Sequence, residues 1–170
     1  AALSLSDWKP GDGRGSRAQI RLDPIDPASA FLLIDESYNA NPVSVRAALE
    51  TLSLAELGKD RTGRPGRRIA VIGDMLELGP DEMAMHAAIA KDPSLAALHT
   101  IHCAGPRMRH LYDALPDGQR GEWAETAGEL ANHPTRLVDA GDVVLVKGSK
   151  GSKISLVVDA VRKLGHPNTV

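Results

Sequence analysis

The chain has 170 residues, a formal net charge of -2 and 42% hydrophobic residues, close to the globular average, so disorder as the default state is excluded. Aromatic residues make up 3%, which argues against a base-stacking surface for single-stranded nucleic acid, and the near-neutral charge provides no overall positive field for nucleic acid or anionic lipid. No apolar run approaches the roughly 20 residues that cross a bilayer. The length suits one domain plus a fragment of a neighbouring one.

The cysteine content and the first residues bear on the compartment. Cys103 is the single cysteine, which excludes an internal disulfide and a cysteine-rich zinc site and favours a reducing environment. The first residues show no signal-peptide pattern and no initiator Met. We therefore expect a cytoplasmic protein and a piece cut from a longer chain.

The first segment of the chain reads as a remnant of one domain followed by a hinge. Residues 1–8 are typical of the end of a helix, and residues 9–17 hold three glycines and a proline, which indicates a linker or turn. Residues 18–22 predict a short strand. We expect residues 1–17 to form the remnant and hinge, and residues 18–170 to form the main domain.

From residue 29 the pattern alternates between apolar runs of strand length and amphipathic stretches. We expect strands over 30–34, 68–72, 98–103 and 142–146, and helices over 42–57, 81–91, 106–115, 126–133 and 152–164. Asn41 and Pro42 suit the N-cap and first turn of the first helix, and Gly58 its end. Continuously apolar strands separated by helices predict a three-layer α/β fold, a doubly wound and mostly parallel Rossmann-like sheet.

Unusual side chains follow the first of these strands. Asp35, Glu36, Tyr38, Asn39 and Asn41 supply carboxylates, a phenol and amides within seven residues, which suit ribose hydroxyls and a heterocycle edge. Ligands of open parallel sheets bind at the carboxyl ends of the strands. We expect the loops after all four strands, over 35–42, 73–79, 104–107 and 147–153, to lie together at that end of the sheet. The alternative is that Asp35 and Asn41 only cap a turn and a helix.

The loop after the last strand is rich in lysine and glycine. Gly148 and Gly151 lie beside Lys147, Lys150 and Lys153, just before the expected helix, a composition that suits an anion site. The spacing is not that of a Walker A loop, and a solvated lysine cluster is the alternative.

Other candidate sites are weak. Residues 13–18 have the spacing of a dinucleotide fingerprint but precede a strand, so we reject that reading and keep only Arg14, flanked by glycines, as an anion contact. The six histidines show no helical metal pairing, and we expect no metal site. Cys103 is expected to be a buried residue at a strand end, and the four methionines to fill the core.

Three sequence runs together resemble the C-terminal domain of the MurF family, the UDP-N-acetylmuramoyl-tripeptide–D-alanyl-D-alanine ligases among the Mur ligases. They are LLIDESYNANP at 32–42, GDMLELG at 73–79 and VLVKGSK at 144–150. The glycine-rich hinge with Arg14 is similar to the family's joint between central and C-terminal domains. The resemblance covers essentially the whole chain.

The resemblance implies an ATP- and Mg²⁺-dependent ligase of peptidoglycan synthesis. In the family, ATP phosphorylates the terminal carboxylate of the UDP-linked peptide, and the amine of D-alanyl-D-alanine attacks the acyl phosphate. The family's phosphate loop and magnesium ligands lie in the central domain, so this chain is expected to hold no catalytic or metal-binding residue of its own. Its partners would be the two substrates and its own N-terminal and central domains, in a monomer without nucleic acid or a membrane span.

The resemblance also implies two groups of contacts. The nucleotide would be met by Arg14, Asp35 or Glu36, Tyr38, Asn39 and Asn41. Which of the two carboxylates meets the ribose stays open. The incoming dipeptide or the domain cleft would be met by Lys147, Gly148, Ser149 and Lys150, on an edge shaped by Asp74 and Glu77.

Two other functions remain open at this point. The chain could be a stand-alone nucleotide-binding or regulatory module, or a protein-interaction domain, although no exposed apolar patch is identified for the latter. A Mur-type ligase with a different amine substrate is a further alternative.

Overall fold

A six-stranded mixed sheet organises the computed structural model, which describes residues 11–166. The predicted helix end at 1–8 and the first residues of the predicted hinge lie outside that range. The strand order is β1-β2-β6-β3-β4-β5, and β1 pairs antiparallel with β2 while all other pairs are parallel. The strands are β1 (Ser16–Arg21), β2 (Ala30–Glu36), β3 (Arg68–Gly73), β4 (Thr100–Ala104), β5 (Arg120–Ala124) and β6 (Val143–Lys147).

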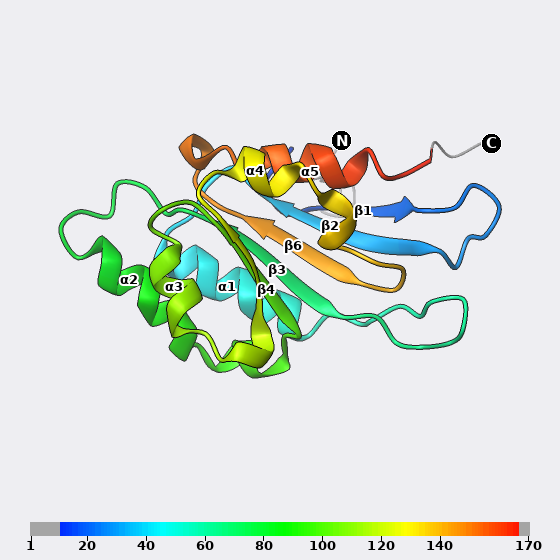
Figure 1. Cartoon of the computed structure of the whole chain (residues 1–170), viewed down its shortest axis with the longest axis horizontal. Coiled ribbons are helices and arrows are strands. Elements are labelled where there is room, and N and C mark those ends of the chain that lie inside the picture. The colour runs from blue at the N-terminus through cyan, green and yellow to red at the C-terminus, as the bar shows by residue number, and fades with distance from the viewer. Residues whose placement is uncertain (1–10, 167–170) are drawn as a thin grey trace, which may run out of the picture.

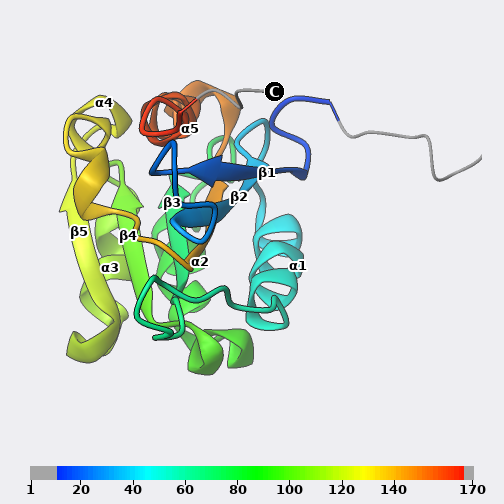
Figure 2. The same cartoon turned by 90° about the vertical axis from the view of Figure 1, so that its right-hand side faces the viewer.

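Helices cover both faces of the sheet, as the doubly wound prediction requires (Figures 1 and 2). One face carries the helices that follow β2, β3 and β4, and the other carries those that follow β5 and β6. They are α1 (Pro42–Ser53), α2 (Glu82–Ala88), α3 (Arg109–Ala114), α4 (Ala127–Ala131) and α5 (Ser155–Arg162). Short 3₁₀ turns lie at Ile89–Lys91, Pro93–Ala97, Asp117–Gln119, Pro134–Arg136 and Lys150–Ser152.

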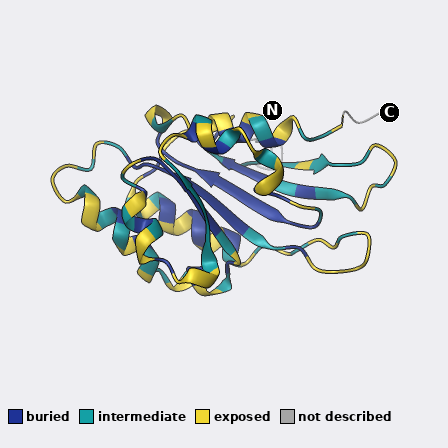
Figure 3. Ribbon diagram, in the orientation of Figure 1, coloured by how far each residue is buried: buried dark blue, intermediate teal, exposed yellow. Residues whose placement is uncertain are grey.

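The core consists of two apolar layers separated by the sheet, and Figure 3 shows the buried central strands between them. Alternate residues of each strand point to opposite layers, so Ile72 of β3 belongs to the same layer as Leu49 of α1, whereas Val71 belongs to the layer of Val157 of α5. With few aromatics available, aliphatic side chains supply most of this burial.

Helix α1 begins where the sequence predicts but ends earlier. Asn41 is its N-cap and accepts from the Ser44 N–H, while the Ser44 hydroxyl accepts from the Asn41 N–H, a reciprocal capping box. The helix ends at Ser53, not at 57, where the Ala55 N–H donates to the Leu52 carbonyl three residues earlier, and the Arg68 guanidinium donates to the Ala55 carbonyl. Gly58 has another role than ending this helix.

That role is a close approach of backbones. The Gly58 N–H donates to the Gly141 carbonyl, and the Gly66 N–H donates to the Gly58 carbonyl. A Cβ at Gly66 would lie 1.9 Å from the Gly141 oxygen, so this junction excludes a side chain at that position.

Several further elements differ from the prediction. Strand β1 begins at Ser16 instead of 18, α2 gives way to a 3₁₀ turn after Ala88, and α3 begins at Arg109 instead of 106. Strand β5 was missed, because Arg120–Ala124 lies at the sheet edge, is only partly buried and lacks an apolar run. Helix α5 begins at Ser155 instead of 152, since a 3₁₀ turn precedes it and Lys153 adopts a left-handed backbone with φ 59°. No helix within residues 11–166 is long and apolar enough to span a bilayer.

Candidate functional site on one edge of the sheet

The four loops that follow β2, β3, β4 and β6 lie together at the end of the sheet where the parallel strands have their carboxyl ends (Figure 1). We call this end the rim. Ser149 joins three of these segments. Its N–H donates to the Asp74 carbonyl at 3.1 Å, its hydroxyl accepts from the Leu76 N–H at 2.9 Å, and the same hydroxyl donates to the Ala40 carbonyl at 3.3 Å. The sequence expectation that the loops around Asn39, Asp74 and Ser149 share one edge is therefore correct.

Asp35 at the end of β2 holds the glycine-rich turn against the sheet. It is 4% exposed, and its carboxylate accepts hydrogen bonds from the Gly13 N–H and from the N–H and hydroxyl of Ser37. Arg162 of α5 lies 3.6 Å from the same carboxylate. Its oxygens are thus occupied by the protein's own donors.

The turn at Gly13 brings Arg14 onto the exposed ring of Tyr38. Gly13 has φ 75° and its carbonyl accepts from the Tyr38 N–H at 3.0 Å. The Arg14 guanidinium lies 4.2 Å from the Tyr38 ring centroid, and the Lys150 ammonium lies 5.6 Å from it. Hydrogen bonding by Arg14, and then the charges of Arg14 and Lys150, lower the pKa of the Tyr38 phenol.

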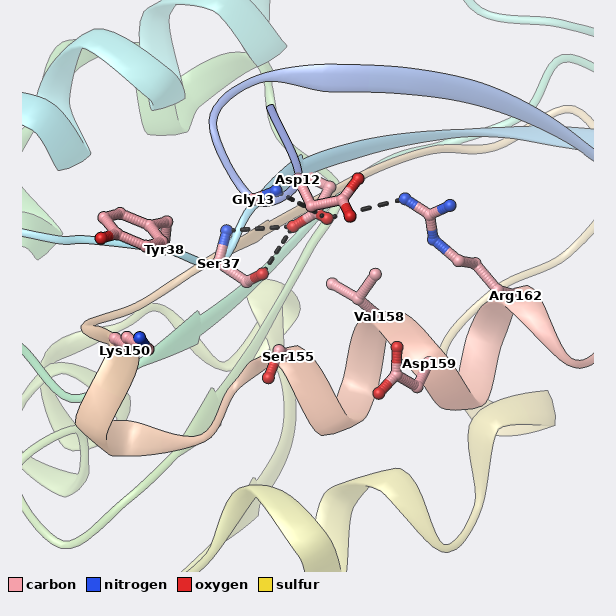
Figure 4. Close-up of a pocket in the computed structure, with 10 residues that line it drawn as sticks. Asp12, Gly13, Ser37, Tyr38, Lys150, Ser155, Val158, Asp159 and Arg162 are labelled. Carbon is pink, nitrogen blue, oxygen red and sulfur yellow. Dashed lines mark hydrogen bonds and ion pairs between the residues drawn. The ribbon is translucent and has the colours of Figure 1, made fainter. Parts of the chain in front are cut away.

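A cleft of about 290 Å³ opens between this turn and α5 (Figure 4). Figure 4 shows Tyr38 and Lys150 at one end and Arg162 at the other, with Asp159 projecting from α5. The lining is Asp12, Gly13, Asp35, Ser37, Tyr38, Lys150, Ser155, Val158, Asp159 and Arg162. Positively and negatively charged side chains therefore surround a space that a small polar ligand can enter.

Lys147 is buried and serves as a brace between strands. It is 4% exposed, and its ammonium donates to the Asn39 carbonyl at 2.7 Å and to Glu36 Oε2 at 3.2 Å. It therefore does not join Lys150 and Lys153, both exposed, in a lysine cluster, and the expected anion site over these three lysines is not assembled.

The glycines of the same loop permit close packing. A Cβ at Gly148 would lie 2.8 Å from Ile154 Cγ2 and 3.1 Å from the Gly73 Cα, and one at Gly151 would lie 2.8 Å from Leu76 Cδ1. The approach to the Gly73 backbone accounts for Gly148 without a bound anion, whereas the contact at Gly151 is with the end of a flexible side chain.

Asp74 and Arg107 connect the loops after β3 and β4. Asp74 is 3% exposed, and its carboxylate accepts from the Met108 N–H at 2.9 Å and from the Arg107 guanidinium at 3.3 Å. Arg107 Nε also donates to Glu82 at 2.9 Å, and this hydrogen bond is the main cause that raises the pKa of Arg107. Glu77 lies exposed on the same loop with φ 61°.

A second cleft, of about 410 Å³, adjoins this pair. Its lining comes from the loops after β3, β4, β5 and β6 and includes Asp74, Arg107, Thr126, Ser152 and Lys153. Within residues 11–166 no group of three His, Cys, Asp or Glu side chains is arranged to hold a metal ion.

The exposed groups of the first loop remain available to a ligand in part. Asn39 uses its side-chain oxygen on the Ala40 N–H, and Asn41 uses its own on the capping box, so both present amide N–H groups on an exposed surface. Glu36 has one oxygen bonded to Lys147, and a Cβ at Gly15 would lie 3.2 Å from the other.

Sequence reasoning missed Arg162, Arg107 and His86, which the fold brings to this edge. Arg162 and His86 lie inside helices and no local pattern marks them. Arg107 lies in a loop that the sequence placed on the rim, and only its ion pairs distinguish it. Cys103 is buried as expected, and burial together with the Asp74 charge raises its pKa to about 12, so the thiol stays protonated. Met75 and Met108 are buried as expected, but Met83 is 58% exposed.

Proteins of similar sequence include ligases of peptidoglycan precursors. The UDP-N-acetylmuramoyl-tripeptide–D-alanyl-D-alanine ligase of Rickettsia prowazekii is 31% identical over 94% of this chain and 32% of its own, and that of Escherichia coli K12 is 31% identical over 85% and 30%. The chain thus spans about a third of the length of these curated relatives.

Solved structures show the same fold. MurF of Acinetobacter baumannii superposes with a TM-score of 0.71 at 23% identity, covering 94% of this chain and 32% of that one. The Thermotoga maritima MurF ligase in complex with ADP gives 0.69 at 23%, covering 94% and 33%. The family model described as "Mur ligase, glutamate ligase domain" matches residues 20–150, and the chain therefore belongs to the Mur ligase family.

Proposed function

We propose that the chain is the C-terminal domain of a UDP-N-acetylmuramoyl-tripeptide–D-alanyl-D-alanine ligase, with residues 1–17 as remnant and hinge and residues 18–170 as the domain. Relatives of that name, about three times as long as the matched segment, support this assignment. The single observation that carries it is the rim, where loops from four strands present exposed polar groups next to two clefts. The domain contributes contacts and not the reacting groups.

The nucleotide side of the rim is proposed at the Arg14–Tyr38 pair. Both side chains are exposed and stacked, so a ring or a phosphate arriving from outside would meet a cation and an aromatic face. The amide N–H groups of Asn39 and Asn41 lie on the same loop. A nucleotide needs such donors and acceptors arranged along an accessible edge.

Of the two neighbouring carboxylates, Glu36 is the better candidate for the ribose. Its side chain is 31% exposed and has one oxygen outside the Lys147 contact. Asp35 is buried and already accepts three hydrogen bonds, so we assign it to holding the Gly13 turn in place. Asp35 would then act on the nucleotide through the position of Arg14.

The amine substrate is proposed on the side of the rim formed by the loops of Asp74, Glu77 and Gly148–Lys150. Lys150 is exposed there, whereas Lys147 would act through the Asn39 carbonyl that it holds. The cleft beside Arg107 adds cations and carboxylates that suit a zwitterionic dipeptide. Closure of this domain over a neighbouring one would bring the two substrates together.

ATP and Mg²⁺ are the proposed cofactors, held mainly by the central domain of the longer ligase. Phosphorylation of the peptide carboxylate gives the amine a better leaving group to displace. The residues of this chain would orient nucleotide and amine and help to exclude water from the closed site.

The test is a ligation assay on the longer protein that carries the chain. ATP, the UDP-linked tripeptide and D-alanyl-D-alanine are supplied together, and phosphate release is followed with each component omitted in turn. We expect release that needs all three, and little with single amino acids in place of the dipeptide. Release with another amine only would indicate a different Mur ligase. Nucleotide binding without release would indicate a regulatory module, and either result would reject the proposal.

A further inference from the structure

A fully buried histidine lies beneath the loop that joins β3 to α2. His86 is on α2 and has no exposed surface. Its Nε2 lies 3.0 Å from the Met75 backbone nitrogen, and its Nδ1 lies 2.6 Å from the Glu82 carbonyl oxygen. Nothing in the proposed function uses this side chain.

The two backbone partners dictate one protonation state of the ring. The Met75 N–H is only a donor, so Nε2 must be without hydrogen. The Glu82 carbonyl is only an acceptor, so Nδ1 must carry the hydrogen. The ring is therefore neutral and in its Nδ1–H form, and both contacts select the same tautomer.

The bond to Met75 completes the fixation of three consecutive residues. The Asp74 carbonyl accepts from the Ser149 N–H, and the Leu76 N–H donates to the Ser149 hydroxyl. The Met75 N–H, in the same peptide group as the Asp74 carbonyl, donates to His86 Nε2. His86 on α2 and Ser149 on the loop after β6 thus fix the start of the loop over residues 74–79 by hydrogen bonds to its backbone.

Loss of the imidazole acceptor leaves the buried Met75 N–H without a hydrogen-bond partner. An unpaired buried donor is costly, and the simplest relief is a shift of the peptide toward water. Such a shift would disturb both Ser149 contacts, and with them the link to the Ala40 carbonyl on the first loop. The position of three rim segments is therefore sensitive to a side chain that does not reach the surface.

We propose that His86 is a positioning residue that sets the geometry of the amine side of the rim through its neutral Nδ1–H imidazole. The role in substrate handling rests on the proposed function, whereas the hydrogen-bond geometry does not. One measurement can therefore test the hydrogen-bond geometry of His86, and a second can test its role in substrate handling.

The first measurement uses the 170-residue chain labelled with ¹⁵N. We expect a scalar coupling across the N–H···N bond between the Met75 amide and His86 Nε2, together with ¹⁵N shifts of a hydrogen-bearing Nδ1 and a bare Nε2. An Nε2–H tautomer, or no coupling to Met75, would overturn the proposal and would leave the proposed function untouched.

The second measurement compares two amide replacements in the longer ligase. His86→Gln can place an oxygen near the position of Nε2, whereas His86→Asn is shorter by one methylene group and cannot. We expect His86→Asn to raise KM for D-alanyl-D-alanine about tenfold or more. KM for ATP should change much less, and His86→Gln should recover most of the loss. His133→Asn, at an exposed position, is the matched control.

The outcomes separate the two claims. Equal losses for the Gln and Asn variants, or equal rises in both KM values, would indicate general destabilisation and would overturn the positioning role. If His86→Asn does not fold, the coupling experiment on the unmodified chain and the His86→Gln kinetics still decide. An unmodified protein that does not ligate would reject the proposed function, while the coupling result would stand.

Discussion

The buried ammonium of Lys147, the last residue of β6, lies 3.2 Å from Glu36 Oε2 at the end of the neighbouring strand β2 and 2.7 Å from the Asn39 carbonyl oxygen. One side chain thus neutralises a carboxylate and holds the following loop in place. A lysine that the sequence suggests as a ligand contact is, in the fold, a support for two other candidate contacts.

Removal of this brace should destabilise the chain. In Lys147→Met the stem is replaced but Glu36 and the Asn39 carbonyl lose their donor. We expect a loss of about 1–3 kcal/mol, below the value for a fully buried pair because Glu36 is partly exposed. Urea unfolding followed by circular dichroism measures it, with Lys163→Met at an exposed site as the control. Equal midpoints for the two variants would show that the brace contributes nothing.

The glycine junction at the opposite edge of the sheet offers a steric test. Gly66→Ala would place a Cβ 1.9 Å from the Gly141 oxygen, so the backbones must separate, and we expect a loss of about 3 kcal/mol or more. Gly118→Ala meets no heavy atom within 4 Å and should change stability by less than about 1 kcal/mol. Similar melting temperatures for both variants would contradict the close approach.

His102 on β4 makes stability depend on pH in a defined window. It is 4% exposed, its Nδ1 accepts from the Glu122 N–H, and burial, followed by the charge of Arg67, lowers its pKa from 6.5 to about 4. Below pH 6.5 His102 binds a proton in the unfolded chain but not in the folded chain. The free energy of unfolding therefore falls as the pH falls, until His102 also titrates in the folded state near pH 4.

The loss across that window should reach roughly 3 kcal/mol, and it should be absent in His102→Asn, whose side-chain oxygen can take the place of Nδ1 as acceptor but does not titrate. Denaturant unfolding between pH 7 and pH 4 measures the slope for both proteins. His133→Asn, at an exposed histidine, should keep the slope of the unmodified chain. A slope that survives in His102→Asn would assign the effect to other groups.

Cys103 should report on opening of the whole fold. With a pKa of about 12 its thiolate is rarer than that of a free thiol by about a thousandfold near neutral pH, in addition to the barrier from burial. We expect iodoacetamide at pH 8 to leave the native chain unmodified and to label it fully in denaturant. Mass spectrometry follows the reaction, and complete labelling of the native chain within minutes would show an accessible thiol.

How far the sequence predicts this molecule depends on whether a signal is local. The strands β2, β3 and β6 were found because each holds a continuous apolar run, and α1 because Asn41 and Pro42 mark its start. Strand β5 has no such run, since an edge strand is covered on fewer sides. Helix ends were misplaced by a few residues where the terminal turn is tighter than an α-helix, as at Ala55 and over Lys150–Ser152.

In the candidate site, too, the features with a local sequence signal could be predicted and those that depend on distant residues could not. The rim follows from strand order and direction, so the loops that form it could be predicted. The state of each side chain could not, because the burial of Lys147 and Asp35 depends on partners distant in the sequence, Asn39 for the first and Gly13 for the second. His86 could not be found at all, since its partners are backbone groups that any sequence supplies.

The central claim is that the exposed Arg14–Tyr38 pair of this chain meets the nucleotide of a ligase. The most direct measurement is KM for ATP in the longer protein with Arg14→Ala, compared with Arg17→Ala on the adjoining strand. Loss of a stacked cation worth about 1–2 kcal/mol predicts a rise of about fivefold to thirtyfold for Arg14→Ala and a change within about twofold for Arg17→Ala. An unchanged KM and kcat for Arg14→Ala would contradict the account.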